Sequence, residues 1–153
     1  MQIVIGEKIR EAVNSVDDLF SLTKFLKKNL KSIPLDEKEK EIRWKRNSEE
    51  ILKDGYVYNG KSCTDICIVA IAILKAKGID SELVKVVSKK RNALHNMVFV
   101  NNLYFDVWAG VFFDEDGFKL NDWVCVERGL DGWSLGLRSF EDERKDMIKY
   151  LKS

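Results

Sequence analysis

Net charge, cysteine and proline are all scarce in this chain, and each scarcity excludes a class of protein. The 153 residues contain three cysteines, which cannot pair completely, and a chain of this length can bury a core without cross-links. Lysine and arginine number 26 against 25 aspartate and glutamate, a balance that argues against a strongly basic nucleic-acid-binding protein. With one proline and no linker-like segment, the chain is expected to form one domain with reduced thiols.

The sequence also lacks a hydrophobic segment long enough to span a membrane. Its most apolar run, Ile66 to Leu74, has nine residues, whereas a transmembrane helix needs about 18 or more. Near the amino terminus, Glu7, Lys8 and Arg10 occur before a signal-peptide core can develop. We therefore expect a cytoplasmic protein without membrane contact.

Helical patterns dominate residues 1–55. Hydrophobic residues from Val16 to Leu30 recur at spacings of three and four, which predicts an amphipathic helix. The charged residues 36–53 predict a surface helix that ends at Gly55. The step at 32–34, Ser-Ile-Pro, is expected to join the two helices, because proline interrupts a helix.

Strand patterns dominate the second half of the chain. Residues 64–77 are apolar on nearly every side and precede Gly78, which predicts a buried central helix with a glycine stop. The expected strands are 82–87, 97–100, 103–108 and 122–126. Turns are expected at Asn101-Asn102 and at Asp114 to Gly117. A last helix is expected from its Ser139 cap to Tyr150. This order predicts an α+β fold: amino-terminal helices and a buried central helix packed against an antiparallel β-sheet.

The three cysteines have different surroundings. Cys63 falls at the amino end of the predicted buried helix, where unpaired amides and the helix dipole stabilise a thiolate, the nucleophilic form. Cys67 lies one turn further along among isoleucine and valine, and Cys125 alternates with valines in a strand. We expect these two to be core thiols.

The single histidine can be placed by hairpin geometry. If Asn101-Asn102 is a two-residue loop, the numbers of opposing residues sum to 203, so His95 faces Trp108. Asp106 is then the diagonal neighbour of His95, within reach of a side-chain hydrogen bond. Because side chains alternate along a strand, one face carries His95, Met97, Phe99, Tyr104, Asp106 and Trp108.

The pairing of His95 with Asp106 has two interpretations. The carboxylate can fix the imidazole tautomer and stabilise the imidazolium that forms when the ring takes a proton from a thiol. It can equally be a turn-flanking carboxylate beside a partly buried histidine. A zinc site of Cys63, Cys67 and His95 is disfavoured, because the sequence has no Cys-x-x-Cys pair and no evident fourth ligand.

Several short motifs occur in a fixed order in the middle of the chain. Residues 60–65 read G-K-S-C-T-D, residues 76–79 read A-K-G-I, and His95 and Asp106 follow on the two predicted strands. In order, spacing and helix context, residues 47–108 resemble the transglutaminase-like superfamily of papain-related cysteine enzymes. That family often has an aromatic residue soon after the histidine and a longer hairpin, whereas here Asn96 follows and the loop is minimal.

The resemblance implies a papain-like fold and a catalytic triad. Cys63 would be the nucleophile, His95 the general base and then acid, and Asp106 the residue that orients His95. The implied reaction is acyl transfer from a peptide or protein amide through a thioester, with no cofactor or metal. For a domain this small, hydrolysis is favoured over cross-linking. On this reading the single domain 1–153 has a helical part (1–55), a catalytic core (56–108), and strands with a carboxy-terminal helix (109–153).

Other residues are candidates for contacts with substrate. The backbone N–H of Cys63, at its helix end, is one expected donor to the oxyanion. A second donor is expected from the upstream segment, where Tyr58 and Asn59 are candidates. Trp108 either walls the site or packs in the core.

Two different classes of function remain open at this point. The charged segment 36–53 is a potential partner surface, so the chain could be a protein-binding module that retains the fold without catalysis. Nucleic-acid binding would need Lys24 to Lys31 and residues 89–91, Lys-Lys-Arg, to lie on one face. The net charge makes nucleic acid an unexpected partner.

Overall fold

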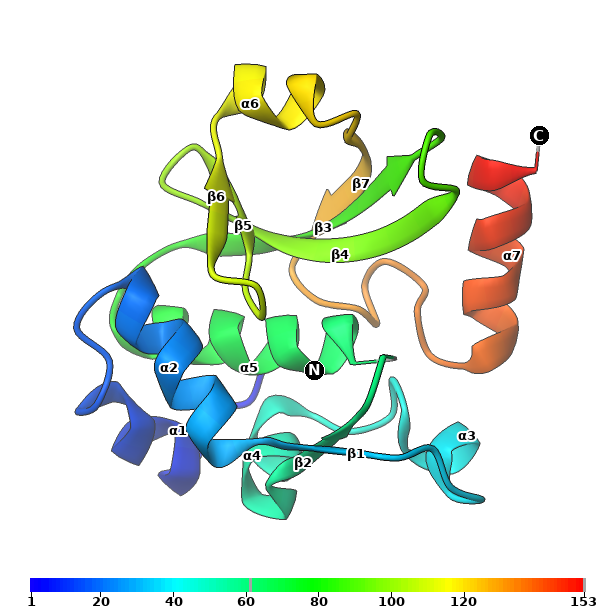
Figure 1. Cartoon of the computed structure of the whole chain (residues 1–153). Helices are drawn as coiled ribbons and strands as arrows, with labels where there is room; N and C mark the ends of the chain where they lie inside the picture. Colours follow the sequence, from blue (N-terminus) through cyan, green and yellow to red (C-terminus); the bar gives the residue numbers. More distant parts are fainter. Residues whose placement is uncertain (61, 153) are drawn as a thin grey trace.

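The fold places helices on both faces of one central sheet (Figure 1). A computed structural model describes residues 1–60 and 62–152; Lys61 of the cysteine motif and Ser153 lie outside the described residues. The helices are α1 (Glu7–Val13), α2 (Leu19–Asn29), α3 (Glu39–Ile42), α4 (Ser48–Asp54), α5 (Cys63–Ala76), α6 (Glu115–Leu120) and α7 (Phe140–Leu151). The strands are β1 (Lys31–Ile33), β2 (Tyr56–Tyr58), β3 (Ser81–Ser88), β4 (Ala93–Val100), β5 (Leu103–Asp106), β6 (Val111–Phe113) and β7 (Val124–Gly129).

Five strands form an antiparallel sheet in the order β6-β5-β4-β3-β7. The β4–β5 hairpin has the predicted register, with Val100 opposite Leu103 and Val98 opposite Phe105. Asn101 and Asn102 form its turn with φ of 54° and 61°, a left-handed conformation that asparagine tolerates better than most residues. The hairpin geometry therefore fixes which β5 residues lie beside β4.

The predicted buried helix is the centre of the molecule. Helix α5 crosses one face of the sheet, with α1, α2 and α4 on its outer side (Figure 1). All nine residues of α5 from Ile66 to Leu74 are buried, and they share one core with Val98, Val100 and Phe105 of the sheet. Burial of this apolar surface on both sides of α5 is the main stabilising contribution to the fold. A smaller cluster around Met97 covers the opposite face, under α6.

The prediction of one surface helix over residues 36–53 is wrong. The segment forms two short helices, α3 and α4, and between them Trp44 adopts a left-handed φ of 64°. Arg43, Trp44 and Arg46 are buried, because this segment turns inward and pairs its guanidinium groups with carboxylates of other elements. The end of α4 is as predicted, with Gly55 at φ 75° as its cap.

Other local differences come from short elements. Asp114 to Gly117 was predicted as a turn, but Asp114 caps α6 by accepting the Gly117 N–H at 2.7 Å, so these residues begin a helix. Strands β1 and β2 pair in parallel, so Ser32 and Ile33 of the Ser-Ile-Pro step lie in a small two-stranded sheet that ends before Pro34. Three-residue strands such as these carry too little periodicity to be found in a sequence.

Helix α7 begins at its predicted Ser139 cap, which accepts the Asp142 N–H.

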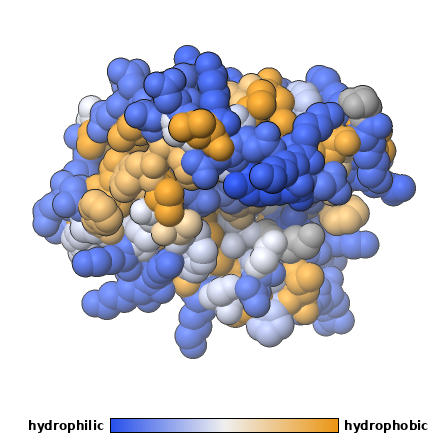
Figure 2. Space-filling model, turned by 45° about the horizontal axis from the view of Figure 1, so that its top comes forward, coloured by the Kyte–Doolittle hydropathy of each residue, from blue (hydrophilic) through white to orange (hydrophobic). Residues whose placement is uncertain are grey.

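The surface seen in Figure 2 has hydrophobic patches separated by hydrophilic side chains. Exposed apolar residues such as Leu120 and Leu130 lie apart in the sequence. Within residues 1–60 and 62–152, no helix combines the length and the hydrophobicity needed to cross a membrane.

Candidate active site

Cys63 is the first residue of α5, which confirms the prediction that it lies at the amino end of the buried helix. The first α-helical hydrogen bond is donated by the Ile66 N–H to the Ser62 carbonyl at 3.0 Å. The N–H of Cys63 therefore belongs to the helix end that carries partial positive charge. The Cys63 residue is partly exposed, whereas Cys67 is buried, and Cys125 is half-buried against the α6-side cluster.

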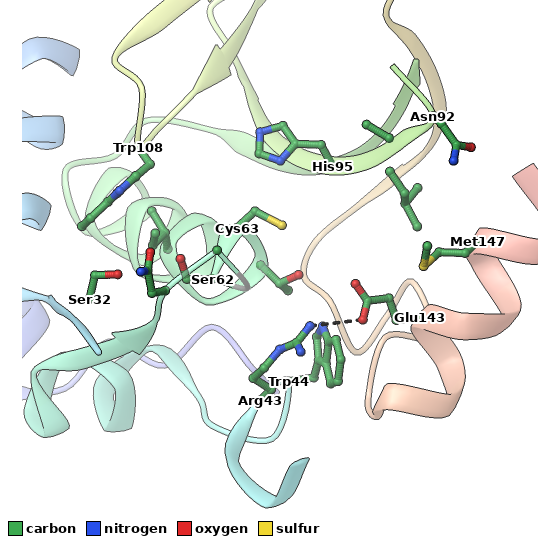
Figure 3. A pocket seen from close by; sticks show the side chains of 16 residues that line it. Ser32, Arg43, Trp44, Ser62, Cys63, Asn92, His95, Trp108, Glu143 and Met147 are labelled. Carbon is green, nitrogen blue, oxygen red and sulfur yellow. Dashed lines mark hydrogen bonds and ion pairs between the residues drawn. The ribbon is translucent and has the colours of Figure 1, made fainter. Parts of the chain in front are cut away.

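His95 and Asp106 make the contact that the hairpin register predicted. The Nε2 atom of His95 lies 3.3 Å from Oδ2 of Asp106, and their side chains are 26% and 23% exposed. Figure 3 shows the His95 ring beside the Cys63 thiol, and the two groups interact electrostatically. The ring of Trp123 lies 5.8 Å from the His95 ring, so an aromatic side chain restricts its movement.

The electrostatics of these three side chains favour a charge-separated pair. Burial acts to raise the pKa of the Cys63 thiol, but the hydrogen bond and positive charge of His95 outweigh it and lower that pKa. Burial acts to lower the pKa of His95, whereas hydrogen bonds with Asp106 and Cys63 raise it to about 10. Cys67 differs, since burial and the neighbouring Cys63 raise its thiol pKa well above the ordinary value. The thiolate form is therefore more accessible at Cys63 than at an ordinary cysteine, and less accessible at Cys67.

A cavity of about 510 Å³ opens at Cys63 and His95 (Figure 3). This volume is within the range of small-molecule and peptide side-chain sites. Figure 3 shows Ser32 and Trp108 on one side of this cavity and Trp44, Glu143 and Met147 on the other. Its lining also includes Asn59, Gly60, Arg43 and Leu94. The cavity therefore joins the helix end, the β4 strand and α7.

The three substrate-contact candidates are placed differently. Asn59 lines the cavity with an exposed side chain. Tyr58 does not line it: its side chain is buried, and its hydroxyl donates to Asp36 Oδ1 at 2.9 Å. Trp108 lines the cavity and also packs against the α5-side core.

The expected pairing of Trp108 opposite His95 is wrong. The β4–β5 ladder ends at Val98 and Phe105, and the chain turns after Asp106, where the Gly110 N–H donates to the Asp106 carbonyl at 2.9 Å. This turn moves Trp108 off the His95 face. The diagonal contact between His95 and Asp106 forms nonetheless, since it needs only the preceding residues of the hairpin.

Residues that the sequence did not single out complete the surroundings of the thiol. Asn96 places its side-chain amide 3.6 Å from Cys63 Sγ and 2.7 Å from Thr64 Oγ1. Arg43, 4% exposed, bonds Glu39 and also Glu143 at 3.1 Å on α7. A polar residue in the middle of an otherwise apolar strand was the available signal for Asn96; nothing in the charged segment distinguished Arg43 from its neighbours.

The part of the chain that the structure describes contains no group of three histidine, cysteine, aspartate or glutamate side chains arranged to hold a metal ion. In particular, the Cys67 thiol donates to the Asn96 carbonyl at 3.6 Å. The zinc alternative thus has no ligand set among these residues. The two basic segments considered for nucleic acid, on α2 and in the β3–β4 turn, lie at opposite sides of Figure 1.

The fold is similar to two solved structures, although no protein-family model and no curated protein matches the sequence. A candidate cysteine protease from Cytophaga hutchinsonii aligns with 90% of this chain and 47% of its own, at a TM-score of 0.59 and 14% identity. This chain therefore spans about half the length of that protein. LapG of Legionella pneumophila aligns with 96% of this chain and 99% of its own, at a TM-score of 0.56 and 18% identity. The predicted fold class is confirmed: the chain has an α+β fold similar to papain-like cysteine protease structures.

Proposed function

We propose that this chain is a cysteine-dependent amide hydrolase or acyl transferase in which Cys63, His95 and Asp106 act together. The observation that carries the proposal is that the Cys63 thiol lies beside the His95 ring in the cavity, while Nε2 of His95 lies 3.3 Å from Asp106 Oδ2. A partly exposed cysteine at a helix amino end has the setting of a reactive cysteine. The similar fold of a candidate cysteine protease is consistent with the proposal.

The proposed reaction has two steps. The Cys63 sulfur attacks the amide carbonyl carbon, a C–S bond forms, and the C–N bond breaks as His95 gives its proton to the leaving amine. Water, or an amine, then attacks the thioester while His95 accepts its proton, and the C–S bond breaks with its electron pair on sulfur. Asp106 orients the ring and stabilises the imidazolium in both steps. The Cys63 N–H and the Asn59 side chain are the proposed oxyanion donors.

A binding module without catalysis is the alternative, and the same contacts argue against it. A binding module has no need for an imidazole beside a partly exposed cysteine, or for a carboxylate 3.3 Å from that imidazole. The charged segment that suggested a partner surface is also partly used inside the protein, since Arg43 and Arg46 are buried.

The test is labelling with a cysteine-directed acyl probe, together with hydrolysis of a peptide-amide library. We expect Cys63→Ala to abolish both, while the matched variant Cys125→Ala, which removes a half-buried thiol in β7, retains both. Equal labelling of the native Cys63→Ala and wild-type proteins would contradict the nucleophile assignment. Release of a free carboxylic acid would indicate hydrolysis, and transfer to an added amine would indicate acyl transfer.

A further inference from the structure

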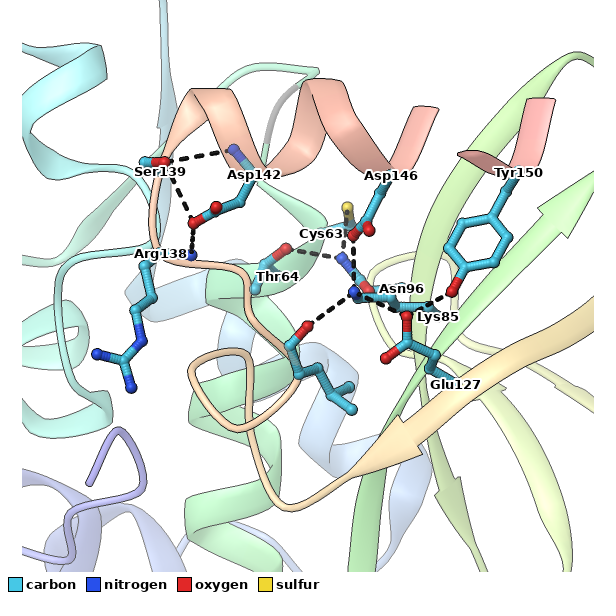
Figure 4. Close-up of polar contacts among 11 residues, drawn as sticks. Cys63, Thr64, Lys85, Asn96, Glu127, Arg138, Ser139, Asp142, Asp146 and Tyr150 are labelled. Carbon is cyan, nitrogen blue, oxygen red and sulfur yellow. Dashed lines mark hydrogen bonds and ion pairs between the residues drawn. The ribbon is translucent and has the colours of Figure 1, made fainter. Parts of the chain in front are cut away.

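Asn96 is a buried polar residue between His95 and Met97 on β4, and its surroundings are unusual for a core strand. It is 7% exposed. Its Nδ2 atom donates to Thr64 Oγ1 at 2.7 Å and to Cys63 Sγ at 3.6 Å (Figure 4). Its backbone carbonyl accepts the Cys67 thiol at 3.6 Å. Asn96 therefore connects β4 to the first two turns of the helix that carries Cys63.

The orientation of the Asn96 amide follows from its two donor contacts. A primary amide has two N–H groups, and the short bond to Thr64 directs one of them, which leaves the other facing the sulfur. Oδ1 of Asn96 has no partner among the described residues, so no contact on the oxygen side sets the orientation. A reversed amide would place that oxygen against the sulfur, which is unfavourable when the sulfur carries negative charge.

We propose that Asn96 is a second hydrogen-bond donor to the Cys63 sulfur, beside His95, and that Thr64 is the positioning residue that orients the Asn96 amide. The inference rests on the proposed function in taking Cys63 as the nucleophile. Hydrogen bonds to a charged acceptor are stronger than neutral ones, so the contact stabilises the thiolate over the thiol. The lowered pKa of Cys63 agrees with this direction.

The amide has a use that His95 cannot supply alone. When the thioester is hydrolysed, the C–S bond breaks and its electron pair returns to sulfur, while His95 carries the proton taken from water. An amide donor has no proton to lose, so its hydrogen bond to the departing thiolate is available at every stage of the reaction. Asn96 and His95 would thus stabilise the same sulfur from consecutive positions of one strand.

The test is the pH dependence of Cys63 alkylation by iodoacetamide, read on the Cys63 peptide by mass spectrometry so that the other two thiols do not contribute. We expect Asn96→Ala to raise the midpoint by about one pH unit, a roughly tenfold loss of thiolate below the midpoint. Thr64→Val should shift it in the same direction by less. Asn96→Asp should shift it further, because a carboxylate repels the thiolate.

Val98→Ala is the matched control for these variants. Val98 is fully buried on β4, on the same face as Asn96, and has no polar side-chain atom. It should lower thermal stability without moving the midpoint. An unchanged midpoint in folded Asn96→Ala, or an equal shift in Val98→Ala, would overturn the inference. If Asn96→Ala does not fold, an unchanged midpoint in Thr64→Val overturns the orienting role.

This measurement separates the inference from the proposed function, because alkylation needs no acyl substrate. If the midpoints shift as expected but the wild-type protein shows no hydrolysis or acyl transfer, the proposed function is overturned and the donor role of Asn96 is supported. Normal hydrolysis with unshifted midpoints would support the function and overturn the donor role.

Discussion

Removal of the Arg46 guanidinium tests how the segment before α4 is held to the helix that carries Cys63. Arg46 bonds Asp65 Oδ2 on the first turn of α5 at 3.0 Å, and their side chains are 7% and 4% exposed. Arg46 also bonds Asp54 at 3.1 Å and the Tyr56 carbonyl at 3.0 Å. Asp65 is the last residue of the cysteine motif, so the pair gives that position a structural role.

The magnitude can be worked from the distance. At 3.0 Å and an effective dielectric constant of about 20, the Coulomb attraction between Arg46 and Asp65 is about 5 to 6 kcal/mol, and desolvation offsets part of it. Removal of one partner from a buried pair costs about 3–5 kcal/mol, because the other charge is left buried. For a domain of this size we expect Arg46→Met to lower Tm by about 6–20 °C.

The loss should depend on pH in a definite direction. Burial raises the pKa of Asp65, and Arg46 opposes that rise, so without Arg46 the folded-state pKa rises further above the unfolded value. A buried carboxyl with a raised pKa costs stability when it is ionised, and the cost disappears as pH falls through the folded pKa and the group takes up a proton. Arg46→Met should therefore be more destabilising at neutral pH than in mild acid.

The assay is thermal and urea unfolding followed by circular dichroism, with a double-mutant cycle of Arg46→Met and Asp65→Asn. The double variant should recover part of the lost stability and lose the pH dependence. The matched control is Arg128→Met, whose ion pair with Glu82 is exposed and 3.5 Å long, and which should cost less than about 1 kcal/mol. Equal losses in Arg46→Met and Arg128→Met, or a loss that does not change with pH, would refute the reasoning.

Three further variants test other contacts. His95→Ala removes the interactions that lower the pKa of Cys63. The rate of Cys63 alkylation in mild acid, measured by peptide mass spectrometry, should therefore fall about tenfold or more. An undiminished rate would contradict the pairing of Cys63 with His95. Lys85→Met leaves the Asp146 carboxylate on α7 without its partner at 2.6 Å. Urea unfolding should show that the free energy of unfolding falls by about 3–5 kcal/mol, and a fall below about 1 kcal/mol would contradict this expectation. Asn102→Val places a β-branched residue at φ 61°. We expect the strained turn to cost about 1–2 kcal/mol and to lower Tm. A Tm equal to that of the wild-type protein would contradict this expectation.

Local patterns in the sequence were sufficient for several features of the fold. The buried helix α5, its glycine stop, the Asn101-Asn102 turn and the Ser139 cap each depend on residues close together in the chain. The hairpin register also follows from the turn alone, and with it the contact between His95 and Asp106. The assignment of Cys63, His95 and Asp106 as a catalytic triad stays a prediction that the acyl-probe experiment tests.

Tertiary structure decided what the charged and polar residues do. The sequence pattern of residues 36–53 is that of an exposed helix, yet Arg43 and Arg46 are buried because carboxylates distant in the chain, on α7 and α5, are available to pair with them. The contact of Asn96 with Cys63 likewise depends on how β4 crosses the start of α5. Periodicity reports which side of an element is apolar, whereas the partner of a buried charge or amide is set only when separate elements pack together.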